Sequence, residues 1–379
     1  MLYDASPAHN PAGTGTFTRG LLTALRSTPG IEVVVSESRG AAFTSIDVGA
    51  KRRLGRLANA ANHLRYFGVD LPARARRAGC DVIFSPSTLG PMTGRTPSII
   101  TVYDLSPIRY ASTMHWTNRR YLQTMLRWQV RRAAAICTIS NAVRGELLEA
   151  FPRRSPQSVH VVTVGPDPEL LRATPVPVSG LDEPFFLMVG TIEPRKNHLT
   201  ALRAFAAYRD RHPSTDATLV MAGSRGWLYQ PVLDMIDTLG LRDRVRLLGR
   251  VEPGQLHWLY RHARALLFPS LYEGFGIPVL EAFLLECPVI AARIPSVMEI
   301  AGEQTATLLE PLDTAQWAAA IEAAAPPSPD MLSRARTRAT DFSWEQSAQD
   351  LREAVLRTLA NGARPTRAEP LAPTGTAGS

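Results

Sequence analysis

The feature that most constrains the fold is an alternation along nearly the whole chain. Short apolar segments rich in β-branched residues are followed by longer segments of helical periodicity. Such alternation is typical of βαβ units, in which helices cover a parallel sheet. It predicts an α/β protein with two doubly wound parallel sheets in tandem. The expected strands are 31–36, 81–86, 98–104, 134–140 and 159–165 in the first half, and 185–190, 217–223, 245–250, 265–270 and 288–293 in the second.

A proline-rich stretch that is poor in large apolar residues separates the two series, so we place the domain boundary there. A chain of 379 residues is also too long for one ordinary core, and two domains imply a cleft between them. The predicted organisation is a first domain at 1–169, a linker at 170–184, a second domain at 185–342, a terminal helix at 343–360 capped by Ser343, and a disordered tail at 361–379.

Composition points to a cytoplasmic protein with no disulfide and no metal. Hydrophobic residues make up 45% of the chain and charged residues 20%, and no run of eighteen apolar residues occurs. Cys80, Cys137 and Cys287 are far apart and lack the spacing of metal ligands, so we interpret them as buried, reduced thiols. The sequence contains no HExxH, no Asp-x-Asp and no P-loop, which argues against a zinc hydrolase, a metal-dependent single-domain transferase and a P-loop kinase.

Positive charge is concentrated in the first half of the chain. Eight basic residues face a single acid, Asp70, within residues 49–80, and residues 109–132 contain six arginines and no acid. The segment at 52–67 also has apolar residues at helical spacing beside arginines. This distribution favours an anionic membrane surface at the inner face of the membrane, or a phosphate-bearing acceptor. A solvated arginine-rich face is the alternative, and we do not expect a nucleic-acid partner.

The segment GTIEPRKN, residues 190–197, lies between an apolar strand and a helical pattern. Helix N-termini carry partial positive charge, so Arg195 and Lys196 are unfavourable there unless an anion such as a diphosphate binds between them. The segment therefore predicts an anion site, with a purely structural turn as the alternative.

A second signal is PSLYEGFGIPVLEAF, residues 269–283, where a strand runs into a glycine-containing loop. Pro278 suits the first helical position, which puts Glu273 on the loop and Glu281 in the first helical turn. Both can line one crevice at the carboxyl end of a parallel sheet, and Gly274 and Gly276 permit close backbone approach. For Glu281 alone, the alternative is that it complements the helix dipole.

These motifs together resemble a known family. The features that carry the resemblance are the pair Glu273 and Glu281, with seven residues between them, and the segments EPRKN, LGRVEPGQLHWLY, GTGTFTRGLLTAL, YDLSP, TISNAVRGEL and FSWEQ. Together they are similar to the motifs of the retaining glycosyltransferases of family 4 (group 1). The style of GTIEPRKN most resembles bacterial mannosyltransferases or related hexosyltransferases that build surface polysaccharides. The resemblance covers nearly the whole chain. It implies the GT-B fold, two Rossmann-like domains facing a central cleft, with the C-terminal helix crossing back to the first domain.

The resemblance also implies roles for particular residues. Arg195 and Lys196 would hold the donor diphosphate, Glu273 would lie against the transferred sugar, and Glu281 would accept hydrogen bonds from the ribose. Asp104 is a candidate for positioning the acceptor. The remaining donor-binding candidates are Gly13 and Gly15 from the first domain, Gly190, the pair Arg250 and Val251 near the base, and the backbone of Gly274, Phe275, Gly276 and Ile277.

By the same resemblance, the protein would transfer a hexose with retention from GDP-mannose, or from UDP-glucose or another donor, to a glycan or lipid-linked acceptor. No metal or cofactor would be needed. The chain departs from the family at Tyr103, where a histidine is common, which raises the alternative of a catalytically inactive glycan-binding or nucleotide-sugar-binding relative. Ser140 and Arg144 match the family loosely, and Ser140 could be a helix cap alone. A nicotinamide oxidoreductase is disfavoured because Thr18 replaces the third glycine of the dinucleotide fingerprint.

Overall fold

The computed structural model describes residues 1–10, 13–38, 61–110, 116–181, 184–324 and 329–362, and these residues form two parallel six-stranded sheets. The first sheet has the order β2-β1-β3-β4-β5-β6, and its strands are β1 (Leu2–Asp4), β2 (Val34–Ser36), β3 (Ile83–Ser85), β4 (Ser98–Val102), β5 (Ala135–Thr138) and β6 (Val159–Val161). The second has the order β12-β11-β10-β7-β8-β9, and its strands are β7 (Phe185–Val189), β8 (Thr218–Ala222), β9 (Val245–Gly249), β10 (Ala265–Phe268), β11 (Val289–Ala292) and β12 (Thr307–Leu309).

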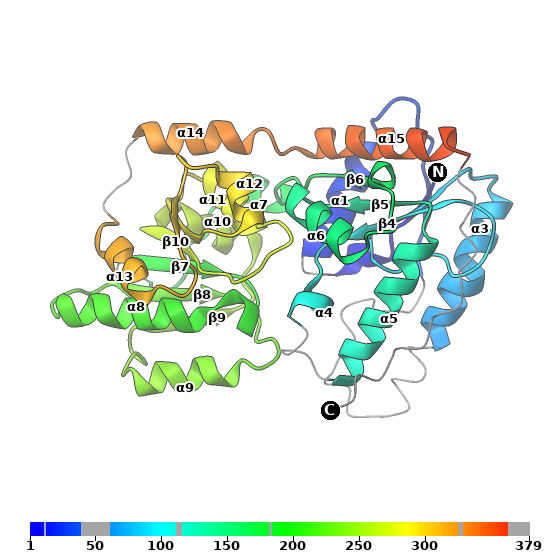
Figure 1. Cartoon of the computed structure of the whole chain (residues 1–379). Helices are drawn as coiled ribbons and strands as arrows, with labels where there is room; N and C mark the ends of the chain where they lie inside the picture. Colours follow the sequence, from blue (N-terminus) through cyan, green and yellow to red (C-terminus); the bar gives the residue numbers. More distant parts are fainter. Residues whose placement is uncertain (11–12, 39–60, 111–115, 182–183, 325–328, 363–379) are drawn as a thin grey trace, which may run out of the picture.

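Helices cover these sheets, as expected for doubly wound domains (Figure 1). In the first half they are α1 (Gly13–Leu25), α3 (Leu71–Arg77), α4 (Ser106–Arg109), α5 (Trp116–Arg132), α6 (Asn141–Ala150) and α7 (Pro168–Arg172). In the second half they are α8 (His198–Arg211), α9 (Gln230–Thr238), α10 (Pro253–His262), α11 (Ile277–Leu284), α12 (Pro295–Ala301), α13 (Thr314–Glu322), α14 (Pro329–Ala339) and α15 (Trp344–Ala360). Short turns of other helix types are η1 (Ser6–His9), η2 (Tyr66–Asp70), η4 (Pro156–Ser158) and η5 (Pro194–Lys196).

All ten expected strands are present, each somewhat shorter than its apolar run, and the structure adds two that the sequence did not predict. β1 is only three residues long, yet it is wholly buried and lies between β2 and β3. β12 is equally short, exposed or half-buried throughout, and lies at the edge of its sheet. Three residues are too few for periodicity to show, so neither strand stood out in the sequence.

The C-terminal helix crosses back to the first domain, as expected. α14 lies over the second domain and α15 runs along the first (Figure 1), where it packs on α1. Trp344 opens α15 and fits against Gly20, where a Cβ atom would lie 2.2 Å from the indole ring. The indole nitrogen donates to the carbonyl of Pro166 at 2.8 Å. Ser343 caps α15 by accepting a hydrogen bond from the amide of Gln346.

The predicted linker, tail and basic segment are described only in part. Helix α7 spans the predicted start of the linker at residue 170 and packs on α10, with the Leu170 carbonyl 3.1 Å from Nδ1 of His257. Residues 363–379 of the predicted tail, and residues 49–60 of the basic segment, lie outside the described residues. Within the part of the chain that is described, no helix has the length and apolar character needed to cross a membrane.

Candidate active site

The site forms where the winding of the second sheet reverses direction. β7 and β10 are parallel neighbours whose connections lead to opposite sides of the sheet, and the loops after two such strands define a crevice at their carboxyl ends. The loops at 190–197 and 269–276 meet there. The amide of Leu271 donates to the Arg195 carbonyl at 2.8 Å, and the side chain of Asn197 donates to the Pro269 carbonyl at 3.0 Å.

The loop after β7 brings both cations to this edge. Gly190 leaves the strand with φ of 136°, a conformation that glycine adopts readily. Pro194, Arg195 and Lys196 form the short turn η5, and Asn197 then takes a left-handed conformation with φ of 54° before α8 begins at His198. The cations thus precede α8 and do not lie in its first turn. Asparagine tolerates this backbone conformation better than most residues.

Arg195, Lys196 and Glu273 converge on one another. The Glu273 carboxylate accepts from Nη1 of Arg195 and from Nζ of Lys196, each at 2.6 Å. Glu193 forms an ion pair with Arg195, with 2.6 Å between Oε1 and Nη2. The Glu273 side chain is 8% exposed, and those of Arg195 and Lys196 are 17% and 14% exposed. This is a nearly buried cluster of two cations and two carboxylates.

The cluster fixes the charge of its members. Burial alone would raise the pKa of Glu273, but Arg195 and Lys196 outweigh it and lower that pKa to about 2. Burial would lower the pKa of Arg195, whereas Glu273 and Glu193 raise it. We expected an external anion to compensate the two cations, but Glu273 and Glu193 of the chain itself already do so.

The loop after β10 depends on its glycines. A Cβ atom on Gly274 would lie 1.9 Å from the backbone oxygen of Tyr103, so a side chain there would push the two domains apart. Gly276 has φ of 137° and caps α11. Phe275 is buried and packs on Phe342, and Ile277 opens α11 with its side chain against Gly13.

Glu281 has a different environment from Glu273. Because α11 begins at Ile277, with Pro278 at its second position, Glu281 lies in the second helical turn and not in the first as predicted. Its carboxylate accepts from the hydroxyl of Tyr260 at 3.0 Å, and none of the described hydrogen bonds joins it to either cation. Burial, reinforced by the charge of Asp167, raises its pKa to about 8. Of the four side chains assigned to the donor site, Arg195, Lys196 and Glu273 therefore contact one another, whereas Glu281 contacts Tyr260.

The first domain presents polar groups to this cluster. Asp104 accepts from the amide and hydroxyl of Ser106, and its charge helps to raise the pKa of Arg195. The hydroxyl of Tyr103 donates to the Pro86 carbonyl at 2.8 Å. Ser140 caps α6 and also donates to the Gly274 carbonyl at 2.6 Å, so it is more than a cap. Arg144 bonds to the carbonyls of Val159 and Pro156 within its own domain.

The remaining donor-binding candidates lie at the domain junction, inside the first domain and after β9. Gly13 lies across the domain junction from Ile277, where a Cβ atom would be 3.2 Å from Cδ1 of that residue. Gly15 is needed within its own domain, because a Cβ atom there would lie 1.7 Å from the carbonyl oxygen of Asn10. Arg250 is exposed and Val251 is half-buried, and both follow β9 rather than β7 or β10.

Two residues of the cluster were missed in the sequence. Glu193 belongs to the EPRKN motif but was given no role, and Tyr272 directly precedes Glu273. The carbonyl of Tyr272 accepts from Arg195 at 2.9 Å, while its hydroxyl bonds to the first domain. The only signal for either residue is its position beside a predicted site residue.

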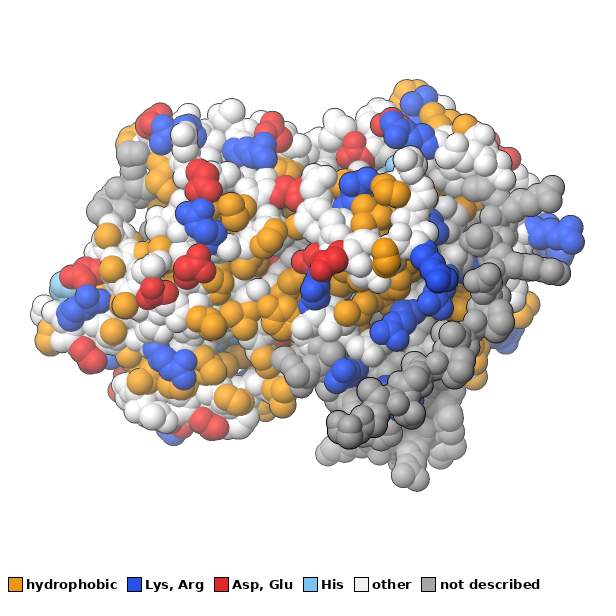
Figure 2. All heavy atoms as spheres, in the orientation of Figure 1, with side chains coloured by type: hydrophobic (Ala, Val, Ile, Leu, Met, Phe, Trp, Pro, Cys, Tyr) orange, Lys and Arg blue, Asp and Glu red, His pale blue; other side chains and the backbone are white. Residues whose placement is uncertain are grey.

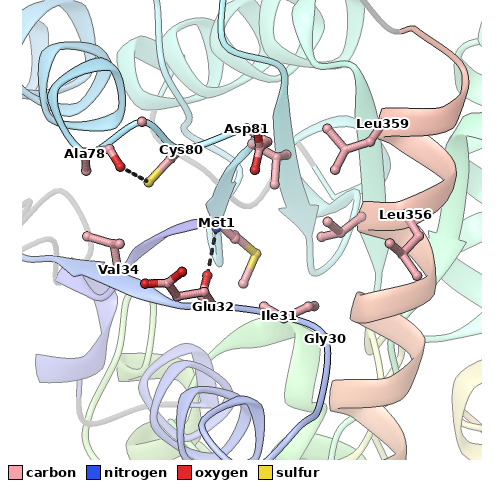
Figure 3. Close-up of a pocket in the computed structure, with 13 residues that line it drawn as sticks. Met1, Gly30, Ile31, Glu32, Val34, Ala78, Cys80, Asp81, Leu356 and Leu359 are labelled. Carbon is pink, nitrogen blue, oxygen red and sulfur yellow. Dashed lines mark hydrogen bonds between the residues drawn. The ribbon is translucent and has the colours of Figure 1, made fainter.

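A cavity of about 180 Å³ lies elsewhere, at the amino ends of β1, β2 and β3 against α15 (Figure 3). The labelled residues include Met1, Glu32, Asp81, Leu356 and Leu359, and the amino group of Met1 donates to the Glu32 carbonyl at 2.8 Å. None of the predicted site residues lines this cavity. It lies at the opposite end of the strands from the edge that carries Asp104.

Comparison with known proteins agrees with this architecture. A model of glycosyltransferase family 4 matches residues 11–170, and a model of the group 1 glycosyl transferases matches residues 174–339. The chain is 28% identical over 271 residues to O-antigen chain mannosyltransferase B of Escherichia coli, which covers 65% of this chain and 67% of that protein. It is 27% identical over 251 residues to O-antigen chain mannosyltransferase RfbU of Salmonella typhimurium, with 66% and 67% covered.

Solved structures show the same fold. Sucrose-phosphate synthase from Thermosynechococcus elongatus superposes with a TM-score of 0.71 at 19% identity, covering 95% of this chain and 99% of that one. HepE from Anabaena, in complex with UDP-glucose, superposes with a TM-score of 0.65 at 18% identity, covering 94% and 98%. The fold and the paired domain matches define a GT-B enzyme of the glycosyltransferase class. The chain belongs to the family 4 (group 1) glycosyltransferases.

Proposed function

We propose that this glycosyltransferase moves a hexose, with mannose favoured, from a nucleotide-diphosphate sugar to a glycan or lipid-linked acceptor during synthesis of a surface polysaccharide, with retention of configuration. The observation that carries the proposal is the cluster of Arg195, Lys196 and Glu273 facing the first domain. A guanidinium beside an ammonium suits a diphosphate, which accepts several charge-assisted hydrogen bonds. The O-antigen mannosyltransferases among the relatives support the sugar and the product class.

In this mechanism, Arg195 and Lys196 bind the diphosphate and stabilise the charge that develops as its bond to the anomeric carbon breaks. The acceptor oxygen bonds to that carbon from the same face, and its proton passes to the leaving phosphate. A nucleoside diphosphate and a glycoside result. Glu273 contacts the hydroxyls of the transferred sugar, and Asp104 positions the acceptor.

The rest of the donor extends over neighbouring loops. Glu281 accepts hydrogen bonds from the ribose beside Tyr260, and Arg250 with Val251 lies near the base. The amides at 275–277 reach the sugar and the phosphate. Neither a metal nor another cofactor is required, because the two side-chain cations carry the electrostatic work.

A panel of nucleotide sugars tests the proposal. Thermal stabilisation is compared for GDP-mannose, UDP-glucose and other donors, and the donor that stabilises most is then used in a transfer assay. We expect GDP-mannose to stabilise most and the new glycosidic bond to keep the donor's configuration by NMR. A greater effect of UDP-glucose would change the donor, whereas an inverted product would contradict retention. Binding with neither transfer nor donor hydrolysis would favour an inactive relative.

We also propose that α5 touches an anionic membrane surface. Arg120, Arg127 and Arg131 recur at helical spacing on its exposed side, and the helix contains no acid. Figure 2 shows basic side chains gathered over this part of the first domain. Co-sedimentation with phosphatidylglycerol vesicles, but not with phosphatidylcholine vesicles, is expected, and Arg120→Glu with Arg127→Glu should abolish it. Equal binding to both vesicle types would contradict this proposal.

A further inference from the structure

Tyr272 links the loop that carries Glu273 to the first domain through a single hydroxyl group. This hydroxyl accepts from the amide of Leu105 at 2.8 Å and donates to the Glu146 carboxylate at 2.8 Å. Leu105 directly follows Asp104, and Glu146 lies on α6. The Tyr272 side chain is largely buried. One phenol oxygen therefore joins the second domain to two separate elements of the first.

A second tyrosine reinforces this contact from the first domain. The ring of Tyr110 stacks on that of Tyr272, with centroids 5.1 Å apart and 27° between the planes. The hydroxyl of Tyr110 donates to the Leu271 carbonyl at 3.0 Å. Within the second domain, Arg195 donates to the carbonyl of Tyr272 at 2.9 Å. The segment before Glu273 is thus held by its own domain on one side and by the first domain on the other.

Helix α6 is the element of the first domain that meets the second domain most directly at this point. Ser140, which caps the helix, donates to the Gly274 carbonyl at 2.6 Å. Glu299 of α12 accepts from the amides of Asn141 and Ala142 at 2.9 and 3.1 Å. Together with Glu146, these residues put three contacts along α6, which all form only when the domains are together.

We propose that Tyr272 is a positioning residue that couples closure of the two domains to the orientation of Glu273. The inference rests on the proposed function, in which Glu273 faces the transferred sugar. Glu273 is followed by the three residues Gly274, Phe275 and Gly276, so the loop has considerable backbone freedom on that side. The hydroxyl of Tyr272 restrains the other side. The restraint exists only in the closed arrangement, because both of its partners belong to the first domain.

Hydrogen exchange gives a reading of closure that does not depend on activity. The amides of Asn141 and Ala142 bond to Glu299 and do not contact Tyr272, so their exchange reports whether the domains stay together. In Tyr272→Phe, which keeps the stacked ring, we expect exchange at these two amides to be several-fold faster. Tyr208→Phe removes a hydroxyl within the second domain, where its partner is Thr215, and should leave the exchange unchanged.

Kinetics then separate positioning from a general loss of structure. Donor binding mainly to the second domain predicts that Tyr272→Phe lowers kcat about tenfold while the KM for the donor changes less than twofold. Glu146→Ala should reproduce the loss, and Glu146→Gln, which retains an acceptor for the hydroxyl, should restore most of the rate. Normal exchange at Asn141 and Ala142 in Tyr272→Phe, or a normal kcat, would overturn the proposal.

Turnover and hydrogen exchange distinguish a failure of the proposed function from a failure of the role of Tyr272. If no nucleotide sugar is turned over by the wild-type protein, the proposed function falls, while faster exchange in Tyr272→Phe still demonstrates that Tyr272 holds the domains together. If transfer proceeds but Tyr272→Phe leaves exchange unaltered, Tyr272 is not a positioning residue and the proposed function stands.

Discussion

Glu273 and Glu281 belong to the same strand-loop-helix unit, yet their surroundings differ in every respect that matters for charge. Glu273 lies between two cations from the loop after β7, and its pKa falls to about 2. Glu281 lies one turn into α11 beside the neutral hydroxyl of Tyr260, and burial raises its pKa to about 8. At neutral pH the first is ionised and the second is largely protonated.

The difference shows that position relative to the neighbouring strand decides the state of a carboxyl group. Residues after β10 that face β7 meet its loop, which supplies Arg195 and Lys196. Glu281, further along α11, faces Tyr260 of α10, which supplies a phenol, and Asp167, which supplies a second acid. Two glutamates of similar burial thus differ by several pKa units for purely local reasons.

Removing Glu273, the ionised glutamate, should have the largest effect on transfer. Glu273→Ala deletes the proposed contact with the sugar and leaves both cations without their shared carboxylate, so we expect transfer to fall about 100-fold or more. The same change should tighten binding of free nucleoside diphosphate, because Arg195 and Lys196 no longer have an internal competitor. Transfer assays and calorimetry measure the two effects. Weaker nucleotide binding in the variant would contradict the competition.

Removing one cation should have a smaller effect. Arg195→Ala or Lys196→Ala each loses a charge-assisted contact worth roughly 1.5–3 kcal/mol, or about tenfold to 100-fold in transfer. Arg203→Ala, at an exposed position of α8, is the matched control and should behave as wild type. Unchanged transfer in both single variants would refute the assignment of the two cations to the diphosphate.

Protonation of Glu281 should make the stability of the folded protein depend on pH. The pKa of Glu281 is raised in the folded state above its ordinary value of 4.5, so its contribution is fully present below pH 4.5 and is lost as pH rises to about 8. Glu281→Gln cannot ionise. Its free energy of unfolding relative to wild type should therefore increase over that window by roughly 5 kcal/mol, as chemical denaturation can measure. A constant difference would mean that Glu281 is ionised in the folded protein.

Chelation should have the smallest effect of all. In the proposed mechanism Arg195 and Lys196 take the place that a metal would hold, so transfer in excess EDTA should equal the untreated rate. Full recovery only on adding a divalent cation, after loss in EDTA, would show that Arg195 and Lys196 are insufficient.

Much of the architecture could be predicted because the apolar runs are long. Six- and seven-residue runs such as 185–190 and 217–223 reveal both a strand and its burial. β1 could not be recognised in this way, although it lies between β2 and β3, because three residues carry no periodicity. The convergence of Arg195, Lys196 and Glu273 followed from the rule that loops after neighbouring parallel strands meet.

The electrostatics of the site could not be predicted, because they depend on distances between loops. The sequence gives no sign that Glu273 pairs with Arg195 and Lys196, or that Glu281 faces Tyr260 instead. The part played by Tyr272 is hidden for the same reason. Its partners Leu105 and Glu146 are more than a hundred residues away in the chain, and only domain packing brings them together.

The most direct test of the central claim is a crystal structure with a bound nucleoside diphosphate. The account predicts that the β-phosphate lies within hydrogen-bond distance of both Arg195 and Lys196, with Glu273 displaced from at least one of them toward the sugar position. A diphosphate bound elsewhere, with both ion pairs of Glu273 intact, would contradict it.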